Sequence, residues 1–328
     1  MFEIREFTDL LPSVNAKNFE DIALKIFRYQ YKNNLLYQSY AQAVGKVPGK
    51  VDRIDEIPFL PIKFFKSHTV ISGIWHPKTE FSSSSTTGTG VSKHLVWNLD
   101  FYLSNAVSIF EQFYNSPSNF HFLALLPSYL EREGSSLIAM IDHFIKKDES
   151  GHSGFYLNNH TDLLDRIQLL EGSPKKTLLW GVSFALLDLA EKSQLDLSNC
   201  IVMETGGMKG RRKEWIRDDL HKYLRKRFNV SEIHSEYGMT ELFSQAYSKG
   251  EGYFNCPPWM KVITREINDP FAYVSGGKIG AINVIDFANV HSCAFIETED
   301  LGRVVGDSFE ILGRMDNSDI RGCNLMVS

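Results

Sequence analysis

"TLLWGVSFALLDLAEKSQLDLSNCIVMETG", residues 177–206, contains two short apolar runs separated by a stretch of helical length. A third apolar run, 121–127, is followed by helix-length stretches at 134–147 and 161–172. Short, continuously apolar strands that alternate with helices are typical of a parallel sheet buried on both faces. The sequence therefore predicts an α/β fold.

The organisation of the chain changes on either side of this core. Pro58 and Pro61 oppose a continuous helix near the end of the first part, which is expected to dock on the core. Beyond Cys256, strand-like runs separated by turn residues predict a β-rich region. The predicted parts are a helical amino-terminal arm with the start of the core, an α/β core, a β-rich subdomain, and a hinge with a terminal tail: 1–80, 81–255, 256–316 and 317–328.

Composition restricts the partners. The chain has 328 residues, 43% of them hydrophobic, and a formal net charge of -5, so nucleic acid and anionic membranes are not attracted overall. No apolar run approaches the ~20 residues of a membrane-spanning helix. Four widely spaced cysteines and a charged start without an apolar leader predict reduced thiols and a cytoplasmic location. Small-molecule and protein partners are expected.

The stretch "FSSSSTTGTGVSKHLV", residues 81–96, is rich in hydroxyls and glycine. If its two ends are strands, the middle is a hairpin turn whose glycines permit close backbone approach and whose hydroxyls donate hydrogen bonds. Such a turn can hold phosphate oxygens, and Lys93 adds a local positive charge. A flexible linker is the alternative reading, because the same residues mark ordinary loops.

A second polar break occurs in "SEYGMTEL", residues 235–242, where a strand-like run ends at Gly238. Tyr237 offers a flat ring for stacking, Thr240 a hydroxyl, and Glu241 a carboxylate that can hold Mg²⁺ against phosphate oxygens. The alternative is an ordinary helix start after a strand.

Three further stretches carry candidate binding residues. "METGGMKGRRKEWIRDDL" (203–220) runs from a strand through two glycines into a basic helix, and such a turn lets a planar ligand approach the backbone. "IETEDLGRV" (296–304) places acids at an expected strand end, where they can accept hydrogen bonds from ribose. "GRMDNSDIRGCNLMV" (313–327) combines Arg and Asp in a turn that can act as a hinge. Simple structural turns are the alternative for the first two stretches, and binding of sugar hydroxyls is the alternative for the third.

These five motifs occur in the order expected for the superfamily of adenylate-forming enzymes, which the chain resembles from about Phe81 onward. In detail it looks most similar to the acyl-protein synthetase component of the bacterial bioluminescence fatty-acid reductase, and more distantly to phenylacetate-CoA ligases. The resemblance implies the large amino-terminal domain of such an enzyme, with helix-flanked sheets, a β-rich subdomain and no mobile carboxy-terminal domain. That domain normally brings a catalytic lysine, and none can be assigned here.

The resemblance also implies roles for individual residues, with ATP and Mg²⁺ as cofactors. Lys93, Thr240 and Cys323 are the expected catalytic residues, Cys323 as the acyl-accepting thiol, and Glu241 is the expected metal ligand. The phosphate loop departs from the family pattern at Ser85, which replaces a glycine, and at Ser92, which replaces a proline. The expected nucleotide-binding residues are Ser84, Ser85, Thr86, Thr87, Gly88, Gly206, Gly207, Met208, Tyr237, Gly238, Asp300 and Arg314.

The predicted function is activation of a carboxylic acid, expected to be a fatty acid, followed by acyl transfer to a cysteine of the protein and delivery to a reductase or carrier protein. A ligase that delivers acyl or aryl groups to coenzyme A or a carrier protein is the alternative enzyme. A non-catalytic nucleotide-binding subunit is the alternative from another class. Side chains at Phe122, Leu125, Tyr129 and Trp180 are candidate walls of the acid pocket, with plain core as the other reading.

Overall fold

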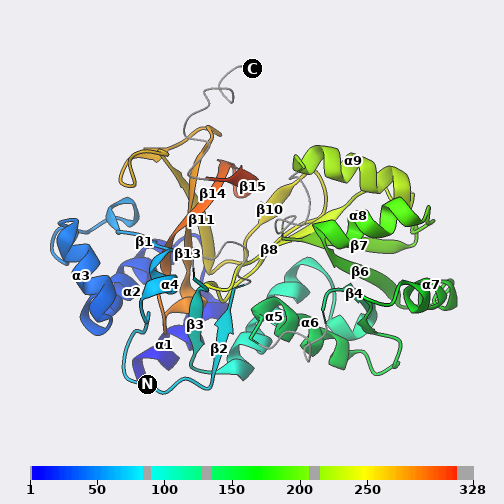
Figure 1. Ribbon diagram of the computed structural model, residues 1–328. Helices are drawn as coiled ribbons and strands as arrows, with labels where there is room; N and C mark the ends of the chain where they lie inside the picture. The colour runs from blue at the N-terminus through cyan, green and yellow to red at the C-terminus, as the bar shows by residue number, and fades with distance from the viewer. Residues whose placement is uncertain (1, 84–89, 128–133, 207–214, 316–328) are drawn as a thin grey trace.

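The computed structural model describes residues 2–83, 90–127, 134–206 and 215–315. Within them, one mixed sheet of 13 strands runs through the molecule, and a separate two-stranded hairpin lies beside it. The order along the large sheet is β12-β11-β13-β14-β15-β10-β9-β8-β7-β6-β4-β5, with β1 paired to β14. Figure 1 shows the sheet passing between a helical group at each side.

The parallel part of the sheet is formed by strands that are almost entirely buried. Their bounds are β4 (Phe120–Leu125), β5 (Gly154–Phe155), β6 (Lys176–Val182), β7 (Cys200–Thr205) and β8 (His234–Tyr237). The chain moves from β4 outward to β5, returns to β6 on the other side of β4, and then continues to β7 and β8. This reversal is a topological switch point, and ligands of open α/β sheets bind beyond the carboxyl ends of the strands there.

Helices cover both faces of this parallel part. In Figure 1, α8 and α9 lie on one side of the strands and α5 and α6 on the other. Ser135 starts α6 and Asn98 starts α5, because each side chain accepts a hydrogen bond from a backbone amide of the first helical turn. The bounds are α5 (Leu99–Phe113), α6 (Ser136–Lys147), α7 (His160–Leu169), α8 (Ser183–Lys192) and α9 (Arg217–Phe228).

The other half of the sheet is antiparallel. Strand β9 runs antiparallel to β8 and begins this half, which includes the strands after residue 255. Their bounds are β9 (Ala246–Ser248), β10 (Tyr253–Asn255), β11 (Met260–Arg265), β12 (Tyr273–Val274), β13 (Gly280–Asp286), β14 (Phe295–Val305) and β15 (Ser308–Arg314). The β-rich character predicted after residue 255 is therefore present, while the proposed boundaries between parts stay a prediction.

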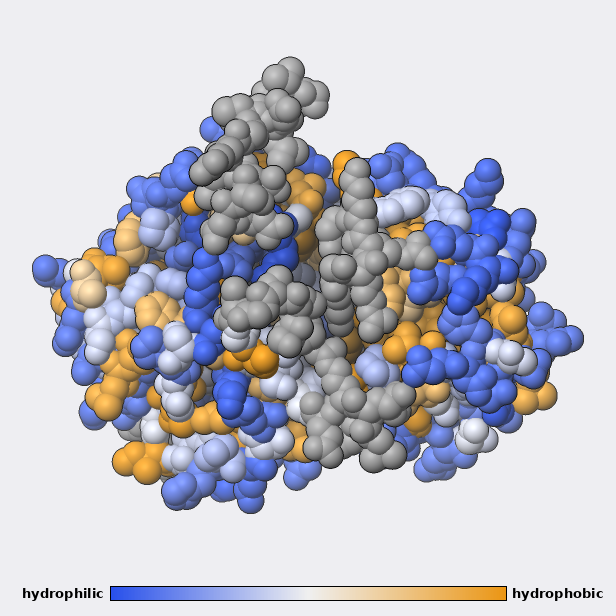
Figure 2. Space-filling view, viewed as in Figure 1, coloured by the Kyte–Doolittle hydropathy of each residue, from blue (hydrophilic) through white to orange (hydrophobic). Residues whose placement is uncertain are grey.

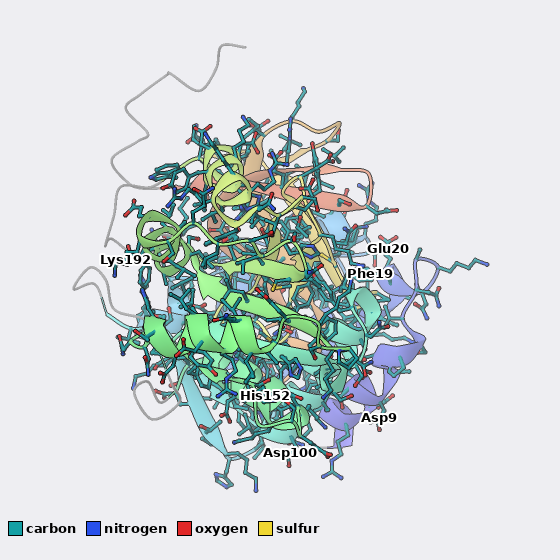
Figure 3. All side chains as sticks on the ribbon, turned by 90° about the vertical axis from the view of Figure 1, so that its right-hand side faces the viewer. Asp9, Phe19, Glu20, Asp100, His152 and Lys192 are labelled. Atoms are coloured by element: carbon teal, nitrogen blue, oxygen red, sulfur yellow. The ribbon has the colours of Figure 1, made fainter. Side chains whose placement is uncertain are left out.

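The amino-terminal arm packs against the antiparallel half. Phe19 stacks on Phe287 with ring centroids 4.4 Å apart, and the Gln30 amide donates to the Val290 carbonyl over 3.0 Å. In the side view of Figure 3, Phe19 and Glu20 lie at the opposite margin from Lys192. The bounds are α1 (Phe2–Leu10), α2 (Phe19–Asn33), α3 (Leu35–Ala43), β1 (Leu60–Pro61) and α4 (Phe64–Ser67), with β1 parallel to β14.

The α/β class and the parallel arrangement of the apolar runs are confirmed. Two local expectations differ from the structure. Arg314 ends β15 rather than sitting in a turn, and Asp300 lies inside β14 rather than at its end. Strand β14 is paired on both sides there, and its register shifts between Ala281 and Asn283 of β13 and, against β15, between Leu301 and Gly302.

The candidate pocket walls are core residues where the structure describes them. Phe122, Leu125 and Trp180 are each 0% exposed, and Tyr129 lies outside the described residues. The reason is that helices cover both faces of the sheet at β4 and β6, so side chains that point to either face are buried.

The visible surface is mixed in character. On the face in Figure 2, hydrophobic residues form separate patches among hydrophilic ones. No helix in the described ranges has the length and apolar character needed to cross a bilayer.

Candidate functional site

The hairpin of β2 (Thr79–Ser82) and β3 (Lys93–Val96) frames the hydroxyl-rich loop. The strands are antiparallel, with Ser82 opposite Lys93. Beyond them, Ser83 N–H donates to the Ser92 carbonyl over 3.1 Å, and Ser92 N–H donates to Ser83 Oγ over 3.0 Å. The two ends of the loop are therefore held together.

The predicted phosphate contacts inside the loop lie outside the described residues; they are Ser84, Ser85, Thr86, Thr87 and Gly88. Lys93 lies at the foot of the loop, where its side chain is exposed and its Nζ is 3.5 Å from Glu80 Oε1. An exposed ion pair of this kind is weak, so Lys93 can leave Glu80 for a more strongly charged phosphate.

Glu241 lies against the other side of this hairpin. The Ser92 side chain lies beside its carboxyl group, and only 6% of Glu241 is exposed. Burial raises the pKa of Glu241, while the neighbouring Ser92 side chain and the positive charge of Arg314 oppose that rise. Residues about 150 positions apart thus meet, because β3 packs against the turn between β8 and β9.

Asp300 and Arg314 lie within electrostatic reach of Glu241. They face each other across β14 and β15, with Arg314 Nε 3.6 Å from Asp300 Oδ1. Arg314 also contacts Glu299 Oε2 at 3.3 Å. Burial raises the pKa of Asp300, and Arg314 and Tyr237 counteract it. A half-buried acceptor beside an exposed cation is suited to hydroxyl and phosphate groups of a nucleotide.

Tyr237 ends β8 and reaches Asp300 directly. Its hydroxyl donates to Asp300 Oδ2 over 2.8 Å, and its ring lies edge-on to Phe309 with centroids 5.3 Å apart. The ring of a second neighbour, Phe254, has its centroid 5.8 Å from the centroid of the Tyr237 ring. The residue predicted to stack on adenine is therefore fixed by aromatic contacts and by the residue predicted to bind ribose.

The predicted adenine loop begins at the carboxyl end of β7. Gly206 has φ of +66°, a conformation that favours glycine. The Ser183 hydroxyl, at the start of α8, donates to the Gly206 carbonyl and lies 3.1 Å from the Glu204 carboxylate. Gly207 and Met208 lie outside the described residues.

The turn after Tyr237 requires a small residue for a different reason. A Cβ on Gly238 would lie 2.4 Å from Glu236 Oε1, closer than atoms can approach. Glu236 is buried and accepts a hydrogen bond from the Thr205 hydroxyl. Two residues on, the Thr240 carbonyl lies 2.7 Å from Nδ1 of His94.

The sequence interpretation missed His94 and Asn289, and it noted Ser92 only as a departure from the family pattern and not as a neighbour of Glu241. Ser92 and His94 alternate with exposed Lys93, so a period of two along β3 is the signal that could have marked them as inward-facing. Asn289, in the short helical turn Phe287–Asn289, donates to the Glu241 carbonyl over 2.7 Å. Nothing in the local sequence around Asn289 points to Glu241.

The thiols in the described ranges are poor nucleophiles. Burial raises the pKa of Cys200 to about 11, of Cys256 to about 12 and of Cys293 to about 12. Because the thiolate is the reacting form, these three cysteines are almost entirely protonated at neutral pH. Cys323 lies outside the described residues.

The described residues do not form an all-protein metal cage. No group of three His, Cys, Asp or Glu side chains among them is arranged to hold a metal ion. Mg²⁺ is commonly held by one or two carboxylates together with substrate phosphates. Glu241, a single buried carboxylate beside the hairpin, fits that mode of binding.

Searches by sequence find no matching protein-family model and no matching curated protein. Solved structures do match. ATP-bound MatB from Rhodopseudomonas palustris has a TM-score of 0.53 and 17% identity over 72% of this chain and 47% of that one. An open conformation of 2-hydroxyisobutyryl-CoA ligase, with 2-HIB-AMP and CoA, has a TM-score of 0.63 and 11% identity over 92% of this chain and 76% of that one. McyG A-PCP with phenylalanyl-adenylate has a TM-score of 0.52 and 15% identity over 75% of this chain and 49% of that one.

These similar structures are adenylate-forming enzymes, and the match establishes that this chain has the fold of their large amino-terminal domain. The chain spans about half the length of the MatB chain, 47% of it. At 11–17% identity the likeness concerns the fold, so the chemistry has to be argued from the residues.

Proposed function

We propose that the chain activates a carboxylic acid with ATP to give an acyl-adenylate and pyrophosphate. The observation that carries the proposal is the buried Glu241 carboxyl group, which has Ser92 of the hairpin beside it and Asp300 and Arg314 in electrostatic reach. Three motifs that are far apart in sequence thereby come together beside the turn between β8 and β9.

The reaction joins two anions, so charge neutralisation is the main task of the residues. A carboxylate oxygen of the acid attacks the α-phosphorus, an oxygen–phosphorus bond forms, and the bond to the β-phosphate oxygen breaks as pyrophosphate leaves. Positive charges fixed where negative charge develops lower the barrier. In this proposal Lys93 neutralises the departing phosphates, and Asp300 accepts hydrogen bonds from ribose hydroxyls.

Mg²⁺, when bound with ATP, supplies further neutralisation of the phosphates. Glu241 would hold it, and Arg314 keeps the Glu241 carboxyl more acidic than burial alone would. Thr240, next to Glu241, has a hydroxyl that can contact the phosphates, and Gly206 would lie near the base.

The decisive test is carboxylate-dependent exchange of labelled pyrophosphate into ATP, across a panel of fatty and aryl acids. We expect exchange with at least one acid and at least a hundredfold loss in Glu241→Gln. Glu266→Gln, an exposed position in the other half of the molecule, is the control and should exchange normally. Absence of exchange with every acid, alone and with a reductase, would instead favour the nucleotide-binding subunit without catalysis.

For the second half-reaction we propose that a fatty acyl group passes to Cys323 and then to a partner reductase. The thiolate attacks the acyl carbonyl carbon, a carbon–sulfur bond forms, and AMP leaves. The resemblance to acyl-protein synthetases supports this acceptor, and so do the raised pKa values of the Cys200, Cys256 and Cys293 thiols.

A ligase that uses coenzyme A is the second candidate. It is favoured by the similarity to 2-hydroxyisobutyryl-CoA ligase, which was solved with CoA and extends over 92% of this chain. Mass spectrometry after incubation with ATP and labelled fatty acid separates the two. A thioester on Cys323, absent in Cys323→Ser, supports self-acylation, and free acyl-CoA formed only with added coenzyme A supports the ligase.

A further inference from the structure

His94 is a fully buried histidine on β3, directly behind the turn that carries Glu241. It is 0% exposed, and its Nδ1 lies 2.7 Å from the Thr240 carbonyl oxygen. A carbonyl can only accept, so Nδ1 carries the hydrogen and donates it. Burial lowers the pKa of His94 to about 4, and the ring is a neutral donor at pH 7.

A second side chain holds the next peptide group. Asn289 Nδ2 donates to the Glu241 carbonyl over 2.7 Å and to the Cys293 carbonyl over 2.8 Å. Two consecutive carbonyls, of Thr240 and Glu241, are therefore each fixed by a side chain from a segment far away in sequence.

Packing leaves His94 little freedom to move. Its ring is nearly parallel to that of His291, with an interplanar angle of 11° and centroids 5.4 Å apart. Phe65 and Phe243 contact it edge-on at 5.6 Å and 5.2 Å. A donor held in this way keeps its acceptor in place.

We propose that His94 and Asn289 are positioning residues that fix the backbone of Thr240 and Glu241, and so aim the Glu241 carboxylate at magnesium-bound phosphates. This inference rests on the proposed function. Because His94 follows Lys93 directly, one strand carries both the cation beside the loop and the donor that holds the Glu241 turn.

His291 provides a matched control. It lies in the same stack and is also 0% exposed. Backbone groups of Leu95 and Ala288 lie near it, but no described residue meets the geometry of a hydrogen bond to either ring nitrogen. His94→Phe and His291→Phe therefore replace the same ring in the same apolar surroundings, and the former alone removes a hydrogen bond to the Glu241 turn.

The experiment measures ATP affinity by calorimetry, with and without saturating Mg²⁺, for the full chain and each variant. The readout is the factor by which Mg²⁺ improves ATP affinity. We expect His94→Phe and Asn289→Leu each to reduce that factor about tenfold, as is typical when a neighbour of a metal ligand is removed. His291→Phe should keep the factor of the unaltered chain even if its melting temperature falls.

Rescue gives a further check. His94→Asn places an amide N–H near the position of Nδ1, and it should recover part of the Mg²⁺ effect that His94→Phe loses. The inference is overturned if His94→Phe and Asn289→Leu keep the full Mg²⁺ effect, or if His291→Phe loses as much as His94→Phe. If the unaltered chain binds ATP without any Mg²⁺ effect, the proposed role of Glu241 fails together with the inference.

Discussion

The Tyr237 hydroxyl donates a hydrogen bond of 2.8 Å to the half-buried carboxylate of Asp300. The two residues come from β8 in the parallel half of the sheet and β14 in the antiparallel half, so the bond joins the two halves at the proposed nucleotide site. Removing this hydrogen bond therefore measures how much the contact between the two halves contributes to the stability of the fold.

Tyr237→Phe should lower the free energy of unfolding by about 0.5–1.5 kcal/mol, because it removes this hydrogen bond from a half-buried acceptor. Tyr247→Phe is the control. The Tyr247 hydroxyl is buried with no hydrogen-bond partner among the described residues, so its removal should be neutral or stabilising. Urea denaturation measures both, and equal losses in the two variants would contradict the role given to the bond.

Gly238→Ala should destabilise the fold by about 1–3 kcal/mol through overpacking. The new Cβ would lie 2.4 Å from Glu236 Oε1 and push that carboxyl away from Thr205. On a Glu236→Ala background the same change should cost little, since the clashing atom is gone. Gly313→Ala, where nothing lies within 4 Å of the Cβ position, is the control, and a double-mutant cycle by chemical denaturation measures the coupling.

Asp148→Asn should cost about 1–3 kcal/mol, because it removes the charge of a buried carboxylate from a pair whose lysine is partly exposed. The Asp148 carboxylate lies 2.7 Å from Lys175 Nζ and 3.0 Å from His121 Nδ1. Asp142→Asn, which removes an exposed pair with Lys146, should cost under about 0.5 kcal/mol.

The pH dependence checks the Asp148 prediction. Burial acts to raise the pKa of Asp148, but hydrogen bonds from Lys175, Ser150 and Ser153 bring it well below the ordinary 3.8. A lowered pKa contributes stability that is present above 3.8 and lost as the pH falls, so the cost of Asp148→Asn should shrink in acid. ATP binding should be unchanged, because His121 and Lys175 lie at the amino ends of β4 and β6, away from the proposed site.

Acid should destabilise the chain through His234. Burial, assisted by the positive charges of Lys249 and Lys176, lowers the pKa of His234 from 6.5 to about 4. Between those values the unfolded chain binds a proton that the folded chain does not, so stability falls as the pH falls through this window. His234→Gln should reduce the slope of unfolding free energy against pH by up to about 1.4 kcal/mol per unit. An unchanged slope between pH 4 and 6.5 would contradict the assignment.

The parallel core could be read from the sequence because its signal is local. The apolar runs at β4, β6 and β7 and the helices between them follow from short-range periodicity, and helices on both faces follow from strands that are apolar throughout. The same feature made the pocket predictions ambiguous, since Phe122 and Trp180 have the composition of a pocket wall and the burial of a core.

The motif residues of the candidate site could be predicted from the sequence, but the residues that hold those motifs in place could not. The turns at Gly206 and Gly238 were recognised because glycine and polar residues follow apolar strands. Ser92, His94 and Asn289 were not, because their importance lies in partners about 50 to 150 residues away.

By itself, the sequence determined the α/β class, the positions of the parallel strands, and the motif residues at their carboxyl ends, since each depends on neighbours a few positions away. The tertiary structure alone decided that Ser92 meets Glu241, that Tyr237 meets Asp300, and that His94 supports Thr240. Those contacts depend on the order of strands in the large sheet and on where the β2–β3 hairpin packs. Local patterning does not encode either, because long-range strand order is set by the packing of the whole core.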